Sequence, residues 1–268
     1  MACTINNFIV DRITRVVGFD NSDNVLFAIN QATDLSINVA SETAEAVDQL
    51  GSPIVVFNRS KTCEVSMNNA IFDMDLLAVQ AGMEGGKQQA ATGVGVIEVP
   101  MFEEIIFAEG TTSYTLAKTP IDAAAVKLYK LNGDGTFGTS YTMDTDASDT
   151  AFALSETTLS APTGLVNKDR LMVVYTYNAD GTDGNGAVTV INSAKNFPKV
   201  CKLVIECLGV EACAPEEMIF MYIIFPSFKP SADMDWTVST DGQHPFNGTA
   251  QQDYCDPDKV LYKVVIPC

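Results

Sequence analysis

The chain has 268 residues, 47% of them hydrophobic, which is enough to fill the core of one large domain or two modest ones without metals or disulfides. Its 34 acidic and 16 basic residues give a formal net charge of -18, which repels phosphate backbones and anionic lipid surfaces and so argues against stable binding to either. This charge has two interpretations: a well-solvated acidic surface, or an acidic wall that an anionic molecule passes without adhering.

The sequence has no pattern typical of export or of a membrane-spanning helix. Asp11 and Arg12 interrupt the short apolar segment near the N-terminus, so the core of a secretory signal is missing. The longest strongly apolar run, residues 218–228, is far shorter than the roughly 20 residues that a membrane helix needs. We therefore expect neither an export signal nor a membrane span.

The cysteines predict neither a zinc site nor a closed set of disulfides, because their number is odd and the sequence holds no C-x-x-C pair. We expect reduced thiols in a cytosolic protein, and crosslinking between subunits is the alternative. The seven cysteines are Cys3, Cys63, Cys201, Cys207, Cys213, Cys255 and Cys268.

Alternating apolar and polar residues predict strands in the first quarter of the chain. Residues 8–19 and 25–29 form a predicted hairpin, and strands are also predicted at 35–40, 54–57 and 61–67. Residues 41–53 are acidic and too long for a tight turn, with Gly51 and Pro53 closing the segment. We predict an exposed, functional loop there.

One helix is predicted, at residues 70–81. Asn69 is placed to cap its N-terminus, and Gly82 is placed to end it in the left-handed conformation. The next segment, residues 82–87, lacks the first Gly and the final Ser or Thr of a phosphate-binding loop. The helix should pack one apolar stripe on the sheet, formed by Ile71, Met74, Leu77 and Ala78.

From residue 98 the predicted strands become short and closely spaced, at 98–108, 125–131, 136–143, 151–154 and 171–177. Residues 132–135, Asn-Gly-Asp-Gly, are a strong hairpin turn. The spacing favours a small inserted sandwich of the immunoglobulin type. Residues 178–186 hold Asp180 and Asp183 but lack the ligand ladder of a calcium loop, so a flexible linker is favoured over a metal site.

Residues 197–228 hold the two most apolar runs of the chain and form the predicted centre of the sheet. Residues 200–208 alternate between an apolar face and a mixed face, whereas residues 218–225 are apolar on both faces, which predicts burial on both sides. In the segments that follow, 226–240 and 260–266, Trp236 is predicted in the core. His244, in the polar loop 241–257, is predicted at the surface.

No combination of residues predicts catalysis. Nucleophilic catalysis by serine or cysteine usually requires a histidine base, and His244 has no third group identifiable from the sequence. Glycosidase chemistry needs only two carboxylates, so a carbohydrate-active or carbohydrate-binding β-sandwich protein stays as an alternative. We expect no enzyme activity, no cofactor and no metal.

The order of strand, long loop, strand and capped helix resembles tail tube (major tail) proteins of long-tailed bacteriophages and related virion structural proteins, and so does the closing pattern. The resemblance implies a mainly β fold: a β-sandwich or barrel of the tail-tube type with one packed α-helix, from residues 1–97 and 190–268, and an inserted immunoglobulin-like β-sandwich, from residues 98–189. The segments that carry it are residues 61–66, 68–70, 78–82, 225–226, 235–239 and 261–266.

The resemblance also implies a ring-forming subunit, commonly a hexamer, whose rings stack around a lumen that conducts DNA without binding it. Carboxylates that face this lumen would repel phosphate. The expected partners are other copies of the chain and other virion proteins, in a virion assembled in the host cytoplasm. We hypothesise that the early strands line the bore and that segment 41–53 reaches the neighbouring ring, with contacts at Glu42, Glu45, Asp48 and Gln49.

A head decoration or other capsid-associated protein is the alternative from the same class, since it shares the β architecture and the absence of catalysis. The shape of the oligomer separates the two functions. Stacked rings indicate a tube, whereas trimers or monomers that bind a capsid lattice indicate decoration.

Overall fold

The computed structural model describes residues 7–92, 95–182, 184–235, 237, 239–240, 242–252 and 256–267. These residues lie mainly in β-strands, and they include one α-helix, α1 (Met74–Gln80), and one 3₁₀-helix, η1 (Ala123–Ala125). The predicted fold class, mainly β with one helix, is confirmed. The chain divides into two compact units: the first combines residues 1–87 with 190–268, and the second consists of residues 88–189.

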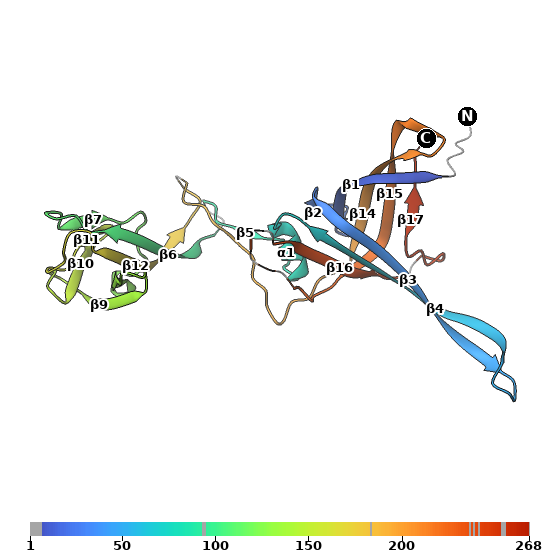
Figure 1. Ribbon diagram of the computed structural model, residues 1–268, viewed down its shortest axis with the longest axis horizontal. Coiled ribbons are helices and arrows are strands. Elements are labelled where there is room, and N and C mark those ends of the chain that lie inside the picture. Colours follow the sequence, from blue (N-terminus) through green and yellow to red (C-terminus); the bar gives the residue numbers. More distant parts are fainter. Residues whose placement is uncertain are drawn as a thin grey trace. The chain divides into compact units, whose positions relative to one another are not determined.

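An eight-stranded antiparallel sheet forms the body of the first unit (Figure 1). Its strands are β1 (Phe8–Phe19), β2 (Val25–Ile29), β3 (Ala32–Val47), β4 (Pro53–Asn69), β14 (Cys201–Glu211), β15 (Ala214–Pro230), β16 (His244–Ala250) and β17 (Lys263–Val265). They pair in the order β2-β1-β14-β15-β16-β4-β3, and β17 also pairs with β15. The predicted hairpin of β1 and β2 is confirmed at its predicted residues.

β14 and β15 form the predicted central hairpin, and the core face of β14 is confirmed. Side chains along β14 alternate between buried and half-buried, and the register pairs Leu203 with Phe225 and Ile205 with Ile223. Other members of the same core are Val16, Phe27, Cys63, Val65, Leu76, Phe228 and Phe246.

The opposite face of β15 is more exposed than predicted. Met218 is 50% exposed and Phe220 is 41% exposed, although apolar residues occupy both faces of the strand. The predicted burial on both sides is therefore wrong at this end of β15. Within the described residues, the core covers the face that carries Ile223 and Phe225.

Helix α1 begins later than predicted. Asp73, and not Asn69, caps it: the backbone of Asp73 is extended, and its Oδ1 accepts a hydrogen bond from the Leu76 N–H (2.7 Å). The predicted end is confirmed, because Gly82 follows the helix with a φ of +68°. The predicted stripe is only partly correct, since the buried residues of the helix are Leu76, Ala78 and Gln80.

β3 and β4 form a much longer hairpin than predicted. Pairing continues to Val47 opposite Pro53, so only residues 48–52 turn. The prediction of a loop over residues 41–53 is therefore wrong. The outer part of the hairpin is exposed on both faces, and a strand without a buried face gives no alternation of apolar and polar residues.

The C-terminal part of the chain differs from the prediction in one strand. The predicted polar loop 241–257 contains β16, which joins β15 to β4. The described residues between 231 and 240 are not in a strand, and Trp236, which was predicted in the core, lies outside the described residues. β17 lies within the predicted strand at 260–266.

The second unit has seven further strands and its own hydrophobic core. These strands are β6 (Ile97–Ile106), β7 (Ser113–Thr115), β8 (Lys127–Leu131), β9 (Phe137–Asp144), β10 (Ala151–Ser155), β11 (Thr158–Ser160) and β12 (Arg170–Ala179). They pair in the order β6-β12-β8-β9-β10-β11-β7. The five predicted strands are confirmed, and the two strands of three residues, β7 and β11, were not predicted.

A two-stranded stem begins and ends the second unit. β5 (Gln88–Gln89) pairs antiparallel with β13 (Val188–Thr189), so that Gln88 lies opposite Thr189. The chain therefore enters and leaves this unit at adjacent positions.

Candidate assembly surfaces

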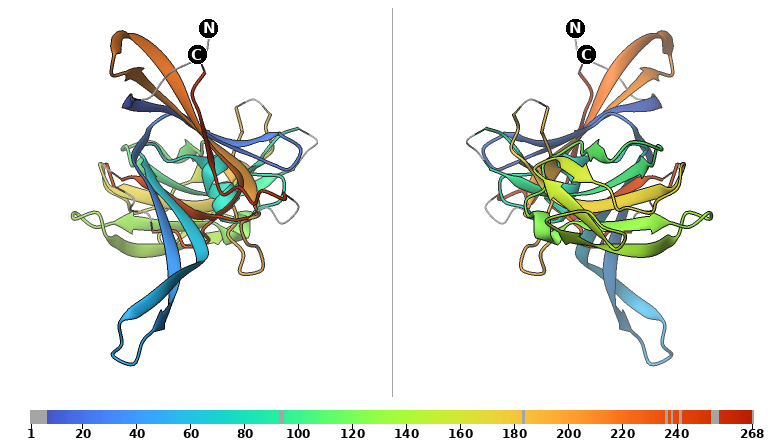
Figure 2. Two further views of the ribbon diagram at one scale, coloured as in Figure 1. Left: turned by 90° about the vertical axis from the view of Figure 1, so that its right-hand side faces the viewer. Right: turned by 90° about the vertical axis from the view of Figure 1, so that its left-hand side faces the viewer.

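The outer part of the β3–β4 hairpin, residues 41–60, extends beyond the rest of the first unit (Figures 1 and 2). We call these residues the arm. Asp48 builds its turn, because Oδ1 of Asp48 accepts hydrogen bonds from the N–H groups of Leu50 (2.8 Å) and Ser52 (2.9 Å). Gly51 completes the turn with a φ of +82°.

The structure places all the predicted contact residues on the arm, where they are exposed: Glu42, Glu45, Asp48 and Gln49. Glu42 lies at a β-bulge of β3, and Glu45 lies opposite Val56. The carboxylate of Asp48 is already used inside the turn. These residues therefore share one paired hairpin, and Asp48 has a structural role that the sequence did not indicate.

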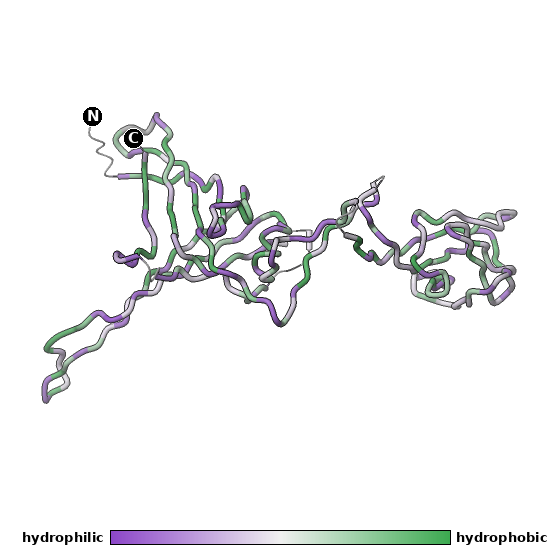
Figure 3. The backbone as a smooth tube through the Cα atoms, turned by 180° about the vertical axis from the view of Figure 1, so that it is seen from behind, coloured by the Kyte–Doolittle hydropathy of each residue, from purple (hydrophilic) through white to green (hydrophobic). Residues whose placement is uncertain are grey.

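The arm also carries an apolar run that sequence reasoning interpreted as an ordinary strand. Ile54, Val55, Val56 and Phe57 are between 44% and 67% exposed, and every residue from 45 to 62 is exposed. Figure 3 shows this run as a green segment near the end of the arm. Apolar side chains on both faces of a strand usually indicate burial on both sides. In an exposed hairpin, this run is the sequence feature that could have predicted a surface covered by a partner.

A second exposed apolar surface lies on the side of β14 and β15 that faces away from the core. Directly paired residues share a face, and Val210 is paired with both Ile9 and Met218. We call this surface the outer face. Its apolar members are Ile9, Leu208, Val210, Met218, Phe220, Tyr222 and Val265.

Charged residues of both signs lie at the border of the outer face. Arg12 and Arg15 lie on β1 opposite Leu208 and Glu206, and Lys263 lies on β17. Two cations make exposed ion pairs of 2.9 Å, Arg12 with Asp11 and Lys202 with Asp23. Glu206, which is paired with both Arg15 and Tyr222, lies on the same face, so the outer face combines an apolar centre with a border of mixed charge.

His244, predicted at the surface, is buried. Its Nδ1 accepts a hydrogen bond from the Asp73 N–H (3.4 Å), its Nε2 lies 2.8 Å from Oε1 of Gln80, and its ring stacks on Phe72 with centroids 5.0 Å apart. Burial lowers the pKa of His244 below its usual value of 6.5. The imidazole joins β16 to α1 and has no open position for a substrate, because its burial is nearly complete.

The buried thiols are unreactive. Cys63, Cys201 and Cys207 lie unpaired in the core, where burial raises the pKa of each, that of Cys201 to about 12. A protonated thiol is a poor nucleophile. Cys213 is free and exposed in the turn between β14 and β15. The other three cysteines, Cys3, Cys255 and Cys268, lie outside the described residues.

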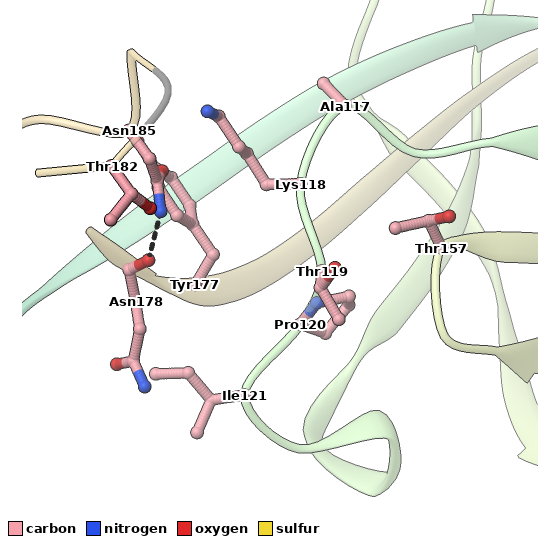
Figure 4. A pocket seen from close by; sticks show the side chains of 10 residues that line it. All are labelled: Ala117, Lys118, Thr119, Pro120, Ile121, Thr157, Tyr177, Asn178, Thr182 and Asn185. Carbon is pink, nitrogen blue, oxygen red and sulfur yellow. Dashed lines mark hydrogen bonds between the residues drawn. The ribbon is translucent and has the colours of Figure 1, made fainter. Parts of the chain in front are cut away.

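The second unit has a hollow of about 530 Å³, bordered by residues 117–121 and by the end of β12 (Figure 4). The Lys118 ammonium lies 5.6 Å from the centre of the Tyr177 ring, and Nδ2 of Asn185 donates to the carbonyl of Asn178 (2.7 Å). None of the residues that line the hollow carries a carboxylate, thiol or imidazole.

In the loop considered as a calcium site, the carboxylate of Asp180 accepts hydrogen bonds from residues of the same loop. Oδ1 of Asp180 accepts hydrogen bonds from the N–H (3.0 Å) and the hydroxyl (2.7 Å) of Thr182, and from Nδ2 of Asn185 (3.2 Å). Asp183 lies outside the described residues. Elsewhere in the described part of the chain, no three His, Cys, Asp or Glu residues are close enough to hold a metal ion.

A single family match covers the whole second unit and most of the first. None of the described helices is long and apolar enough to cross a membrane. No curated protein matches the chain. The sequence profile of the YomU/Tube protein family matches residues 7–256, which is most of the chain. The chain therefore belongs to the YomU/Tube protein family, and it is a tube-like structural protein of bacteriophage virions.

Proposed function

We propose that the chain is the subunit of a phage tail tube, in which copies form rings and the rings stack around an acidic lumen that conducts DNA. The arm is the observation that carries this proposal, because its apolar run is exposed along its whole length. Apolar side chains contribute to stability only when they are removed from water. Contact with a second copy removes the arm from water, and Glu42, Glu45 and Gln49 then lie within or beside that contact.

The net charge supports the acidic lumen. A conduit must not retain its cargo, and carboxylates on its wall repel phosphate and remove the gain from counterion release that makes basic channels bind DNA. The chain has 34 acidic residues to supply such a wall. Retention of DNA by assembled tubes at low salt would contradict this part of the proposal.

We also propose that the first unit forms the tube, with hexameric rings, and that the second unit is an immunoglobulin-like module attached to it. The second unit has its own core and is connected to the rest of the chain through the stem. This arrangement supports a separable module.

A chain with a shortened arm tests the proposal. Thr43 and Asn58 are paired in β3 and β4, so an Asn-Gly turn can replace residues 44–57 and still close the hairpin. We expect a folded chain that forms no tubes, because the apolar run and the turn of the arm are gone. Circular dichroism reports folding, and negative-stain electron microscopy reports tubes.

A variant with Glu42→Gln and Glu45→Gln separates the charge of the arm from its apolar run, because it keeps the length and the apolar run of the arm. We expect this variant still to form tubes, at a somewhat higher protein concentration, since exposed charges contribute only about 0–1 kcal/mol each. Full-length tubes from the shortened chain would overturn the role of the arm.

A further inference from the structure

The arm and the outer face both expose apolar side chains. Phe57 on the arm is 55% exposed, and Ile9 and Met218 on the outer face are 57% and 50% exposed. Exposed apolar patches on a folded protein mark contact sites, and each of these two patches needs an apolar partner.

The charges beside the two surfaces allow a pair of opposite sign. Glu42 and Glu45 lie on the β3 strand of the arm, whereas Lys263 lies on β17 at one edge of the outer face. Arg15, at the other edge, already lies opposite Glu206. Opposite charges at the border of an apolar contact fix its register and disfavour wrong partners.

The two surfaces lie at opposite ends of the first unit. In Figures 1 and 2 the turn between β14 and β15 lies at one end, and the arm extends from the other. An arm therefore meets an outer face most simply on another copy. Such a contact joins two different surfaces, so each copy can insert its arm into one neighbour and receive the arm of another, and the contact can repeat along an assembly.

We propose that the outer face of one copy binds the arm of the next copy, with the apolar run at residues 54–57 packed against Leu208, Met218 and Phe220 and the acidic strand of the arm beside Lys263. This contact rests on the proposed tube function, and it names the surface that receives the arm.

The variant Phe220→Glu tests the receiving surface. It places a carboxylate in the apolar centre, where it is desolvated and repels the acidic arm, so we expect the critical concentration for assembly to rise by at least about tenfold. Phe102→Glu is the matched control, because Phe102 is also an exposed strand residue, on β6 of the second unit. We expect Phe102→Glu to assemble normally. Sedimentation measures assembly, and circular dichroism verifies that both variants are folded.

A photo-crosslinker tests the contact directly and leaves the outer face unchanged. Benzoylphenylalanine replaces Phe57 in the full chain, and assembled copies, half of them labelled with ¹⁵N, are irradiated and mapped by mass spectrometry. We expect crosslinks between copies to peptides of β1, β14 or β15. The same group at Phe137, an exposed residue of β9, is the control and should give no such crosslinks.

The outcomes separate this contact from the tube function. Tubes that form, but whose residue 57 crosslinks to other segments, overturn the contact and leave the tube function in place. Normal assembly of folded Phe220→Glu protein overturns the contact as well. An unmodified chain that stays monomeric at high concentration overturns the tube function, and the contact with it.

Discussion

Gly82 ends α1 where a side chain does not fit. A Cβ at this position would lie 2.5 Å from the backbone of Phe197, whereas a Cβ at Gly85, which has a φ of +83°, would meet nothing within 4 Å. We expect Gly82→Ala to lower the free energy of unfolding by about 2–4 kcal/mol, and Gly85→Ala by about 1–2 kcal/mol from its left-handed backbone alone. Denaturant titration measures both values. Equal losses would show that the close approach to Phe197 has no energetic effect.

His244 makes the stability of the first unit depend on pH. Because burial lowers its folded pKa, the unfolded chain holds more protons between that pKa and about 6.5. The free energy of unfolding should therefore be constant near pH 7 and fall as the pH drops through 6.5. His244→Gln should be less stable but lack this slope. An equal slope between pH 7 and 5.5 in both proteins would contradict the assignment.

The burial of His244 could not be predicted from its neighbours in the sequence. Pro245 and the polar residues around it are typical of a surface loop. Its partner Gln80 is separated from it by 164 positions, and the pairing of β16 with β4 brings the two together. Local patterns report propensity and burial, but they do not report which distant strands pair.

Among the elements, strands with one buried face could be predicted, and strands without one could not. β14 alternates because its two faces meet different surroundings, so its start and its core residues followed from the sequence, although the strand ends three residues later than predicted, at Glu211. The arm lacks a buried face, and its Ala and Glu residues have weak strand propensity. Its acidic residues were contact candidates through the hypothesis that segment 41–53 reaches the neighbouring ring. Its apolar run was missed because such runs usually belong to covered strands.

The stem makes the second unit removable. Gln88 and Thr189 are direct partners, so a short turn in place of residues 89–188 closes the chain without moving either end. We expect this shortened protein to fold and to form tubes, because the first unit keeps its whole core. Circular dichroism and negative-stain microscopy test both expectations. An aggregated or unfolded product would show that the first unit depends on the second.

The stem also has an evolutionary consequence. Genetic exchange at this pair of strands can add, delete or swap a whole cassette of coding sequence, and the register of the eight-stranded sheet stays the same. Selection on the second unit can then proceed separately from selection on the eight-stranded sheet of the first unit.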